Sequence, residues 1–194
     1  MTVDLLLWDF GDTLVDERWM RRPPRDRPSW EMAWLESMAV LADRWNVGEL
    51  SSEEVFADLA TRTGMSTAAV AEHARECCSR LVFNRIAWRV AREHRRPQAI
   101  VTVNPDLFDD VVVPLHRLAG VFDVIVSSAT ERTVNKTDLC LQAIEQLGIS
   151  ASRSRALLID NRRDLVDGWR AAGGAGYWFQ GDDVFGWDLP ALFQ

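Results

Sequence analysis

The chain of 194 residues is poor in several residue types, and each shortage narrows what the protein can be. It has only three cysteines, an odd number that supports no disulfide framework and is typical of a reducing compartment. No apolar run approaches the roughly 20 residues that a membrane helix needs. The first ten residues, MTVDLLLWDF, lack the basic start of a signal peptide. We therefore expect a cytoplasmic protein with no membrane partner.

Positive charge is also scarce. Lysine and arginine together number 22 against 29 acidic residues, which gives a net charge of -7. A nucleic-acid binder normally carries a basic stripe that replaces counterions on phosphates, so we expect no nucleic-acid partner. Lys136 is the only lysine in the chain. A position that stays lysine among arginines suits a compact ammonium group, although drift in composition explains the pattern equally well.

An all-helical block occupies the first half of the sequence. Apolar residues recur at three- and four-residue steps from Trp30 to Trp45, which predicts one helix. Ser51 with Glu54 is a capping-box signature and predicts a second helix that ends at Gly64. A third helical stretch runs to about residue 95, perhaps with a break. The segment before the block, residues 15–28, is polar and rich in proline and arginine, and predicts a linker.

Short apolar runs that alternate with helical patterns occupy the rest of the chain. They predict strands over residues 3–9, 98–103, 122–127, 156–160 and 177–179. Alternation of this kind indicates a parallel sheet with helices on both faces. The predicted fold is therefore a Rossmann-like α/β core, residues 1–15 and 97–194, with a helical cap, residues 16–96, inserted after the first strand. A chain of this length can bury a core of that size.

Polar residues follow the first four predicted strands. They are Asp9, Gly11, Asp12 and Thr13; Thr102 and Asn104; Ser127 and Ser128, with Lys136 at the next helix start; and Asp160, Asn161 and Asp164. Because ligands bind at the carboxyl ends of parallel strands, we expect these groups to converge on one edge. Carboxylates, a lysine and hydroxyl groups suit a hard cation and a phosphoryl group. Any one of them alone is explained as a helix cap.

The order of these motifs resembles the haloacid dehalogenase (HAD) superfamily over residues 1–180. LLLWDFGDTL is similar to the first motif, IVTVN to the second, Lys136 in NKTDLC to the third, and ALLIDNRRD to the fourth. The helical block is similar to the family's cap, inserted between the first and second motifs. The resemblance implies a Mg²⁺-dependent hydrolase, most simply a phosphatase of a small phosphorylated metabolite, working as a monomer or homodimer.

The resemblance also implies roles for particular residues. Asp9 would be the nucleophile that forms an aspartyl-phosphate. The Mg²⁺ ion would be held by Asp9, the backbone carbonyl of Gly11 and Asp160, with Asp164 in the same acidic cluster. Thr102, Asn104 and Lys136 would bind the phosphoryl group, and Lys136 would offset its charge. Thr13 would turn the loop through its hydroxyl.

One position departs from the family's pattern. Phosphatases of the family carry a second Asp two residues after the nucleophile as general acid and base, whereas this chain has Gly11 there and Asp12 one place later. General acid–base catalysis contributes roughly 10²–10⁴-fold. Asp12 either reaches the leaving oxygen from a remodelled loop or is a turn residue. Otherwise the substrate has a good leaving group, a water or a cap residue such as Asp16 or Glu17 supplies the proton, or the protein is weakly active or silent.

Two relatives that lack the second Asp give further alternatives. Phosphonate-cleaving members use a cap lysine, and the cap here has none. Haloacid dehalogenases need no metal, so Asp160 argues against them, and we retain a dehalogenase as the lesser alternative. Three tryptophans, Trp19, Trp30 and Trp34, would favour an apolar or aromatic substrate if they line the cleft. Packing within the cap explains Trp30 and Trp34 better.

Overall fold

The computed structural model describes residues 3–16, 22–24, 27, 29–148 and 152–192. Its centre is a five-stranded sheet in the order β3-β2-β1-β4-β5, and every pairing is parallel. The strands are β1 (Leu5–Trp8), β2 (Gln98–Thr102), β3 (Val124–Ser127), β4 (Ala156–Asp160) and β5 (Ala175–Trp178). This arrangement confirms the predicted α/β fold class.

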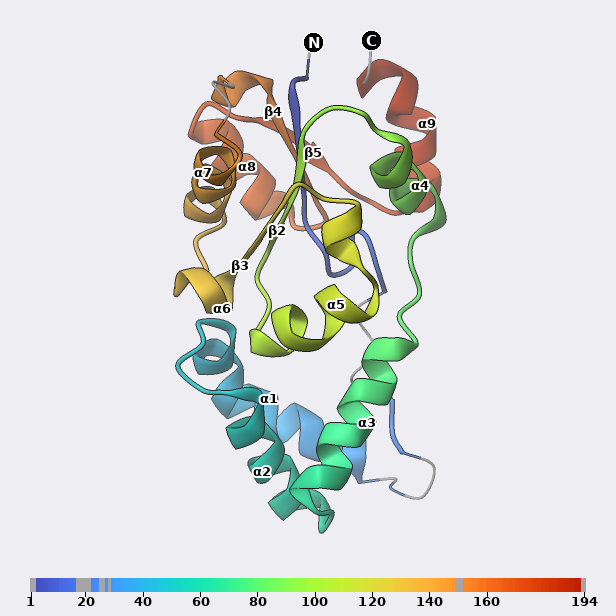
Figure 1. Cartoon of the computed structure of the whole chain (residues 1–194), viewed down its shortest axis with the longest axis vertical. Helices are drawn as coiled ribbons and strands as arrows, with labels where there is room; N and C mark the ends of the chain where they lie inside the picture. Colours follow the sequence, from blue (N-terminus) through green and yellow to red (C-terminus); the bar gives the residue numbers. More distant parts are fainter. Residues whose placement is uncertain (1–2, 17–21, 25–26, 28, 149–151, 193–194) are drawn as a thin grey trace.

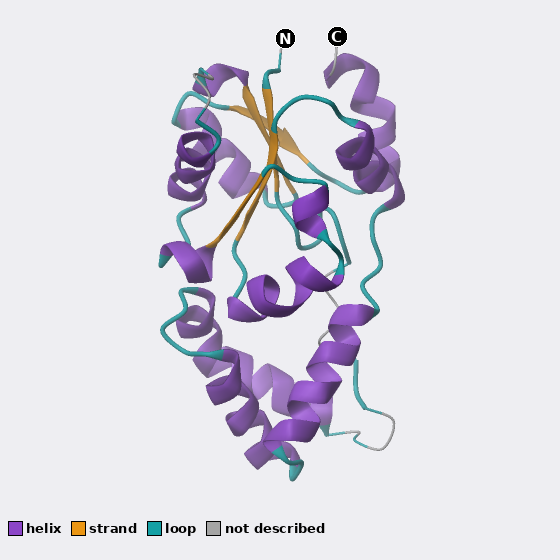
Figure 2. Ribbon diagram, in the orientation of Figure 1, coloured by secondary structure: helices purple, strands orange, loops and turns teal. Residues whose placement is uncertain are grey.

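Helices cover both faces of the sheet, which explains why its central strands are apolar throughout (Figure 2). Leu5 and Leu7 pack with the side of α7 (Lys136–Gln146) and α8 (Arg163–Ala171), whereas Leu6 and Trp8 face α4 (Arg85–Glu93) and α9 (Asp182–Leu192). Successive side chains of a strand point to opposite faces, so one short run, LLLW, feeds two cores. The indole of Trp8 meets the ring of Phe185 edge-on at 5.9 Å between centroids.

The helical block forms the end of the molecule remote from the two chain ends (Figure 1). It consists of α1 (Trp30–Asn46), α2 (Ser52–Thr63) and α3 (Thr67–Ser79). The predicted capping box is present, because the Ser51 hydroxyl accepts from the backbone N–H of Glu54 and the Glu54 carboxylate accepts from that of Ser51. Gly64 ends α2 at φ 68°, a left-handed conformation that favours glycine.

The third predicted helix is interrupted. After α3 the chain returns to the first loop of the core, where the Asn84 side chain donates to the carbonyl of Thr13 at 2.8 Å. Helix α4 follows and lies beside α9, with the carboxylate of Asp182 accepting from the N–H groups of Ile86 and Ala87. This helix belongs to the predicted cap range of residues 16–96, yet it packs on the core. The division into two domains itself stays a prediction.

The segment from β2 to β3 is less regular than predicted. A π-helical turn (Phe108–Val112) precedes α5 (Val113–Leu115), and a 3₁₀ turn (Leu118–Gly120) follows. Pro114 was expected to bend or end this helix, and α5 ends one residue later. Helices α6 (Ser128–Glu131) and α9 were not anticipated. No helix within the described ranges is both long and apolar enough to cross a bilayer.

The strand order places a crevice next to β1. From β1 the chain crosses first to β2 on one side and later to β4 on the other. In open α/β sheets, ligands bind outside the carboxyl ends of the strands at such a reversal. The topology therefore directs attention to the residues that follow β1, β2 and β4.

Candidate active site

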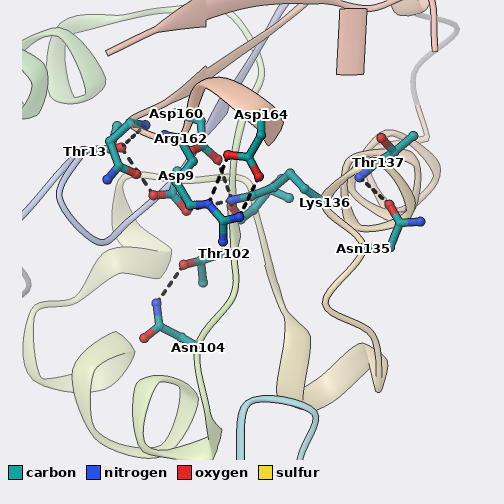
Figure 3. A network of polar contacts seen from close by, with 12 residues as sticks. Asp9, Thr13, Thr102, Asn104, Asn135, Lys136, Thr137, Asp160, Arg162 and Asp164 are labelled. Carbon is teal, nitrogen blue, oxygen red and sulfur yellow. Dashed lines mark hydrogen bonds and ion pairs between the residues drawn. The ribbon is translucent and has the colours of Figure 1, made fainter. Parts of the chain in front are cut away.

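The predicted convergence of the strand ends is present. Asp9 directly follows β1, Thr102 ends β2, Asp160 ends β4 and Lys136 begins α7. All four side chains line one cavity of about 420 Å³ between the sheet edge and the helical block. Residues far apart in the sequence thus meet in one place (Figure 3).

Lys136 lies between the two carboxylates. Its Nζ is 2.7 Å from Oδ1 of Asp9 and 2.9 Å from Oδ2 of Asp160, and it donates to the carbonyl of Val101 at 2.8 Å. The residue is only 3% exposed. Burial alone would lower the pKa of Lys136, but the adjacent charges of Asp9 and Asp160 outweigh it and raise that pKa. The side chain is therefore a buried ammonium group.

Asp9 has an unusual acidity. Burial raises the pKa of Asp9 to about 6, and the charge of Asp160 raises it further, while Lys136 works in the opposite direction. The Thr13 hydroxyl donates to Oδ2 of Asp9 at 3.3 Å and accepts from the N–H of Asn161 at 3.1 Å. Thr13 thus ties the loop after β1 to the loop after β4 and orients Asp9, which agrees with the loop role expected for it.

The residues present fit a magnesium ion. Two buried carboxylates share one ammonium, so the cluster retains an excess of negative charge that a cation would neutralise. Oδ2 of Asp160 is buried and has no hydrogen-bond partner apart from its ion pair with Lys136. The backbone of Gly11 borders the same cavity. Mg²⁺ is commonly held by one or two carboxylates together with waters and substrate phosphates, and this donor set matches that habit.

Asp164 does not join this pair. Its carboxylate is 65% exposed and accepts from Arg162 Nη2 at 2.6 Å and from Arg162 Nε at 3.3 Å (Figure 3). Within the described part of the chain, no three His, Cys, Asp or Glu side chains gather as a metal cluster. The structure thus brings together Asp9 and Asp160 but leaves Asp164 at the surface, and its place in the metal site stays a prediction.

Thr102 and Asn104 form a polar wall of the cavity. Both are buried, and the amide of Asn104 donates to the Thr102 hydroxyl at 2.7 Å (Figure 3). A hydroxyl that accepts in this way still has its own proton to donate. Lys136 and Thr102 therefore present donors to the same space, as a phosphoryl-binding role requires.

The structure separates Asp12 from the cavity. Gly11 borders it, whereas Asp12 is exposed and is not part of its wall. Asp12 has a φ of 51°, in the left-handed region that favours glycine. Its role as a displaced general acid stays a prediction. Of the two cap acids considered, Asp16 is half-buried and Glu17 lies outside the described residues.

Sequence reasoning missed Arg162. It follows β4, lines the cavity, and its backbone N–H donates to Oδ1 of Asp160 at 2.8 Å. Its guanidinium charge also interacts with Asp160 and Asp9. The signal was its position two residues after a strand-end aspartate, but arginine is so common in this chain that its type gave no warning.

The helical block supplies an apolar wall. Trp34, Leu35, Met38 and Trp45 border the cavity from α1. Trp34 thus lies where an apolar substrate would require it, whereas Trp30 is fully buried and packs edge-on against the His73 ring. Trp19 lies outside the described residues.

A parallel sheet of this order, with helices inserted after its first strand and an aspartate, a lysine and a second aspartate at its carboxyl edge, is a HAD-like fold. Solved structures support this fold over nearly the whole chain. No protein-family model matches the sequence, and no curated protein matches it.

Three similar structures show how wide the likeness is. The HAD-family enzyme bt-2542 of Bacteroides thetaiotaomicron is 14% identical, with a TM-score of 0.72 over 100% of both chains. A predicted HAD-like hydrolase from Porphyromonas gingivalis is 17% identical, with a TM-score of 0.71 over 100% of this chain and 99% of that one. The L-2-haloacid dehalogenase of Xanthobacter autotrophicus is 18% identical, with a TM-score of 0.64 over 90% of this chain and 76% of the dehalogenase.

The first of these proteins has also been solved as a complex with magnesium and inorganic phosphate. That complex is 13% identical to this chain, with a TM-score of 0.69 over 92% of this chain and 95% of the other. The resemblance stated from the sequence is therefore confirmed for the fold.

Proposed function

We propose that this protein is a Mg²⁺-dependent HAD-like hydrolase that removes the phosphoryl group from a small phosphorylated molecule. The observation that supports this most is the buried ammonium of Lys136, which lies within 2.9 Å of both Asp9 and Asp160 at the base of a cavity. An acidic attacking group, a fixed positive charge and a second carboxylate are the groups that phosphoryl transfer needs. The magnesium–phosphate complex of the similar Bacteroides protein supports the same proposal.

In the proposed reaction an oxygen of Asp9 attacks phosphorus and displaces the alcohol, which forms an aspartyl-phosphate. Water then attacks that phosphorus, releases inorganic phosphate and restores Asp9. Lys136 offsets the charge of the transferred group, and the Thr102 hydroxyl donates to one of its oxygens. A bound Mg²⁺ ion, held by Asp9, Asp160 and the Gly11 carbonyl, would supply further charge neutralisation.

Proton transfer is the weak part of this machinery. Gly11 provides no acid beside the leaving oxygen, so the departing alkoxide must take its proton from solvent water or from another group. The proposed enzyme should therefore hydrolyse phosphates with good leaving groups, such as acyl and aryl phosphates, much faster than simple alkyl phosphates.

A direct assay tests this function. Hydrolysis of 4-nitrophenyl phosphate should require Mg²⁺, stop with a chelator and stop in Asp9→Asn. The matched control is Asp4→Asn, because Asp4 lies at the opposite end of β1 in a surface ion pair with Arg155. Binding of phosphate without any turnover would instead indicate a silent fold.

A dehalogenase is the second candidate. The apolar wall of α1 suits the carbon chain of a haloalkanoic acid, and a dehalogenase lies among the similar structures. In that reaction an Asp9 oxygen would attack carbon and halide would leave, with no acid required at position 11. Halide release in the presence of a chelator, with no phosphatase activity, would favour this candidate over the phosphatase.

A further inference from the structure

The cavity is divided by polarity. Every ionised side chain on its wall comes from the core: Asp9, Lys136, Asp160 and Arg162. The part contributed by α1 is apolar except for Asn46 at its end. The charged residues of α1, such as Glu31, Glu36 and Asp43, are exposed and lie outside that wall.

Trp45 appears polar by composition but presents only its ring to the cavity. Its indole N–H donates to Asp106 at 2.9 Å and to the Ser52 hydroxyl at 3.3 Å. Asp106 also accepts from the backbone N–H of Ser52 at 2.8 Å. Because these bonds occupy the only donor of the indole, Trp45 offers a ligand an apolar surface. The ring of Trp34 meets it edge-on at 6.2 Å.

Contacts with the core hold this apolar wall in place. Asp106 follows β2, so its bonds to Trp45 and Ser52 join the helical block to the core. The Ser128 hydroxyl donates to the carbonyl of Asn46 at 2.6 Å. Gly48, at φ 66°, approaches the backbone of Ala129 so closely that a Cβ atom there would lie 2.7 Å from its carbonyl oxygen. The end of α1 is therefore fixed above the carboxylates.

We infer that the substrate is a phosphate monoester whose alcohol is apolar, aliphatic or aromatic, and that α1 binds this part through Trp34, Leu35, Met38 and Trp45. The inference rests on the proposed function, because the phosphoryl group must sit beside Asp9. A sugar or polyol phosphate would bring several hydroxyl groups against a wall without partners for them, and each unpaired buried hydroxyl weakens binding. A second phosphate would meet no cation on α1.

Competitive inhibition by alkylphosphonates tests this inference without interference from leaving-group chemistry. The inhibition constants of ethyl-, butyl- and hexylphosphonate are measured against 4-nitrophenyl phosphate. Burial of each methylene contributes about 0.8 kcal/mol, so the inhibition constant should fall by about threefold to fourfold per carbon until the cavity is filled. Hexylphosphonate should also bind at least tenfold tighter than the phosphonate of a six-carbon polyol.

Matched variants locate the binding surface. Leu35 is 48% exposed and borders the cavity, and Val40 is 66% exposed on the same helix but does not border it. The double variant Leu35→Gln/Met38→Gln should weaken hexylphosphonate about tenfold. Val40→Gln should leave its inhibition constant within twofold. Neutral glutamine is used because an acidic side chain would repel any anion.

Acetyl phosphate separates the two levels of the proposal, because its acyl group is too short to need α1. Turnover of acetyl phosphate with equal inhibition by all the phosphonates, or with the polyol compound preferred, would overturn the apolar substrate and leave the phosphatase standing. No turnover of acetyl phosphate and no phosphorylation of Asp9 would overturn the proposed function itself, and the inference with it.

Discussion

Exchanging Gly11 and Asp12 should convert the protein into a better phosphatase. In the double variant Gly11→Asp/Asp12→Gly, the new carboxylate occupies a position that borders the cavity, whereas Asp12 does not. Glycine in turn occupies the position with φ 51°. The exchange thus supplies a general acid beside the leaving oxygen and removes a left-handed L-residue.

The expected magnitudes follow from these two changes. A side chain at a left-handed position costs about 1–2 kcal/mol, less for Asp, and the added glycine loses about 0.4–1 kcal/mol through chain entropy. The free energy of unfolding should therefore change little. General acid–base catalysis contributes roughly 10²–10⁴-fold, so even an imperfectly placed carboxylate should raise kcat/KM for alkyl phosphates by at least about tenfold.

The assay compares leaving groups. The kcat/KM of the wild type should fall steeply as the pKa of the leaving alcohol rises, and the double variant should flatten that dependence. Asp12→Gly alone is the matched control, because it removes the backbone strain without adding an acid at position 11. A folded double variant with the same steep dependence as the wild type would refute the reasoning.

Four further predictions address other parts of the site. In metal-free protein the native pKa of Asp9, about 6, lies above its ordinary value of 3.8, so the native state binds more protons in this window and stability should fall as pH rises through it; urea unfolding of Asp9→Asn should lack that slope. Lys136→Met leaves two buried carboxylates without their ammonium and should lower the free energy of unfolding by about 3–5 kcal/mol in metal-free protein, with partial recovery on adding Mg²⁺. Asp106→Asn weakens a charged acceptor between cap and core and should cost about 1–3 kcal/mol in thermal unfolding, and an unchanged Tm would show that this contact does not hold the cap. Arg162→Gln should weaken inhibition by inorganic phosphate about tenfold, whereas Arg163→Gln, at an exposed side chain, should not, and equal effects would remove Arg162 from the phosphate site.

The displaced-acid hypothesis for Asp12 has its own test. Turnover is compared in Asp12→Asn and Asp12→Ala, which remove the titratable proton with and without a polar side chain. A loss in both variants would indicate that Asp12 reaches the leaving group when substrate is bound. Unchanged turnover in both would end that hypothesis, as its exposed position outside the cavity leads us to expect.

The sheet and its functional edge were predictable because their signals are local. An apolar run such as LLLW can be buried on both faces only in a covered parallel sheet, and strand ends in such a sheet meet at one edge. This reasoning brought Asp9, Thr102, Lys136 and Asp160 together without any coordinates. The capping box at Ser51 was equally local and was found for the same reason.

Features that depend on tertiary contacts were not predictable. Helix α9 has a glycine and a proline within it, so its local signals indicate a loop, but Phe185 packs against Trp8 and holds it on the sheet. Asp164 was placed with the other acids on sequence spacing alone. Its side chain turns outward to Arg162, and spacing carries no information about that direction.

Trapping the covalent intermediate tests the central claim most directly. The protein is mixed with acetyl phosphate and Mg²⁺, quenched in acid within the first turnover, digested and analysed by mass spectrometry. The account predicts one added phosphoryl group on the peptide that contains Asp9, absent with a chelator and absent in Asp9→Asn. Rapid phosphate release with no label at Asp9, or a label on another residue, would contradict it.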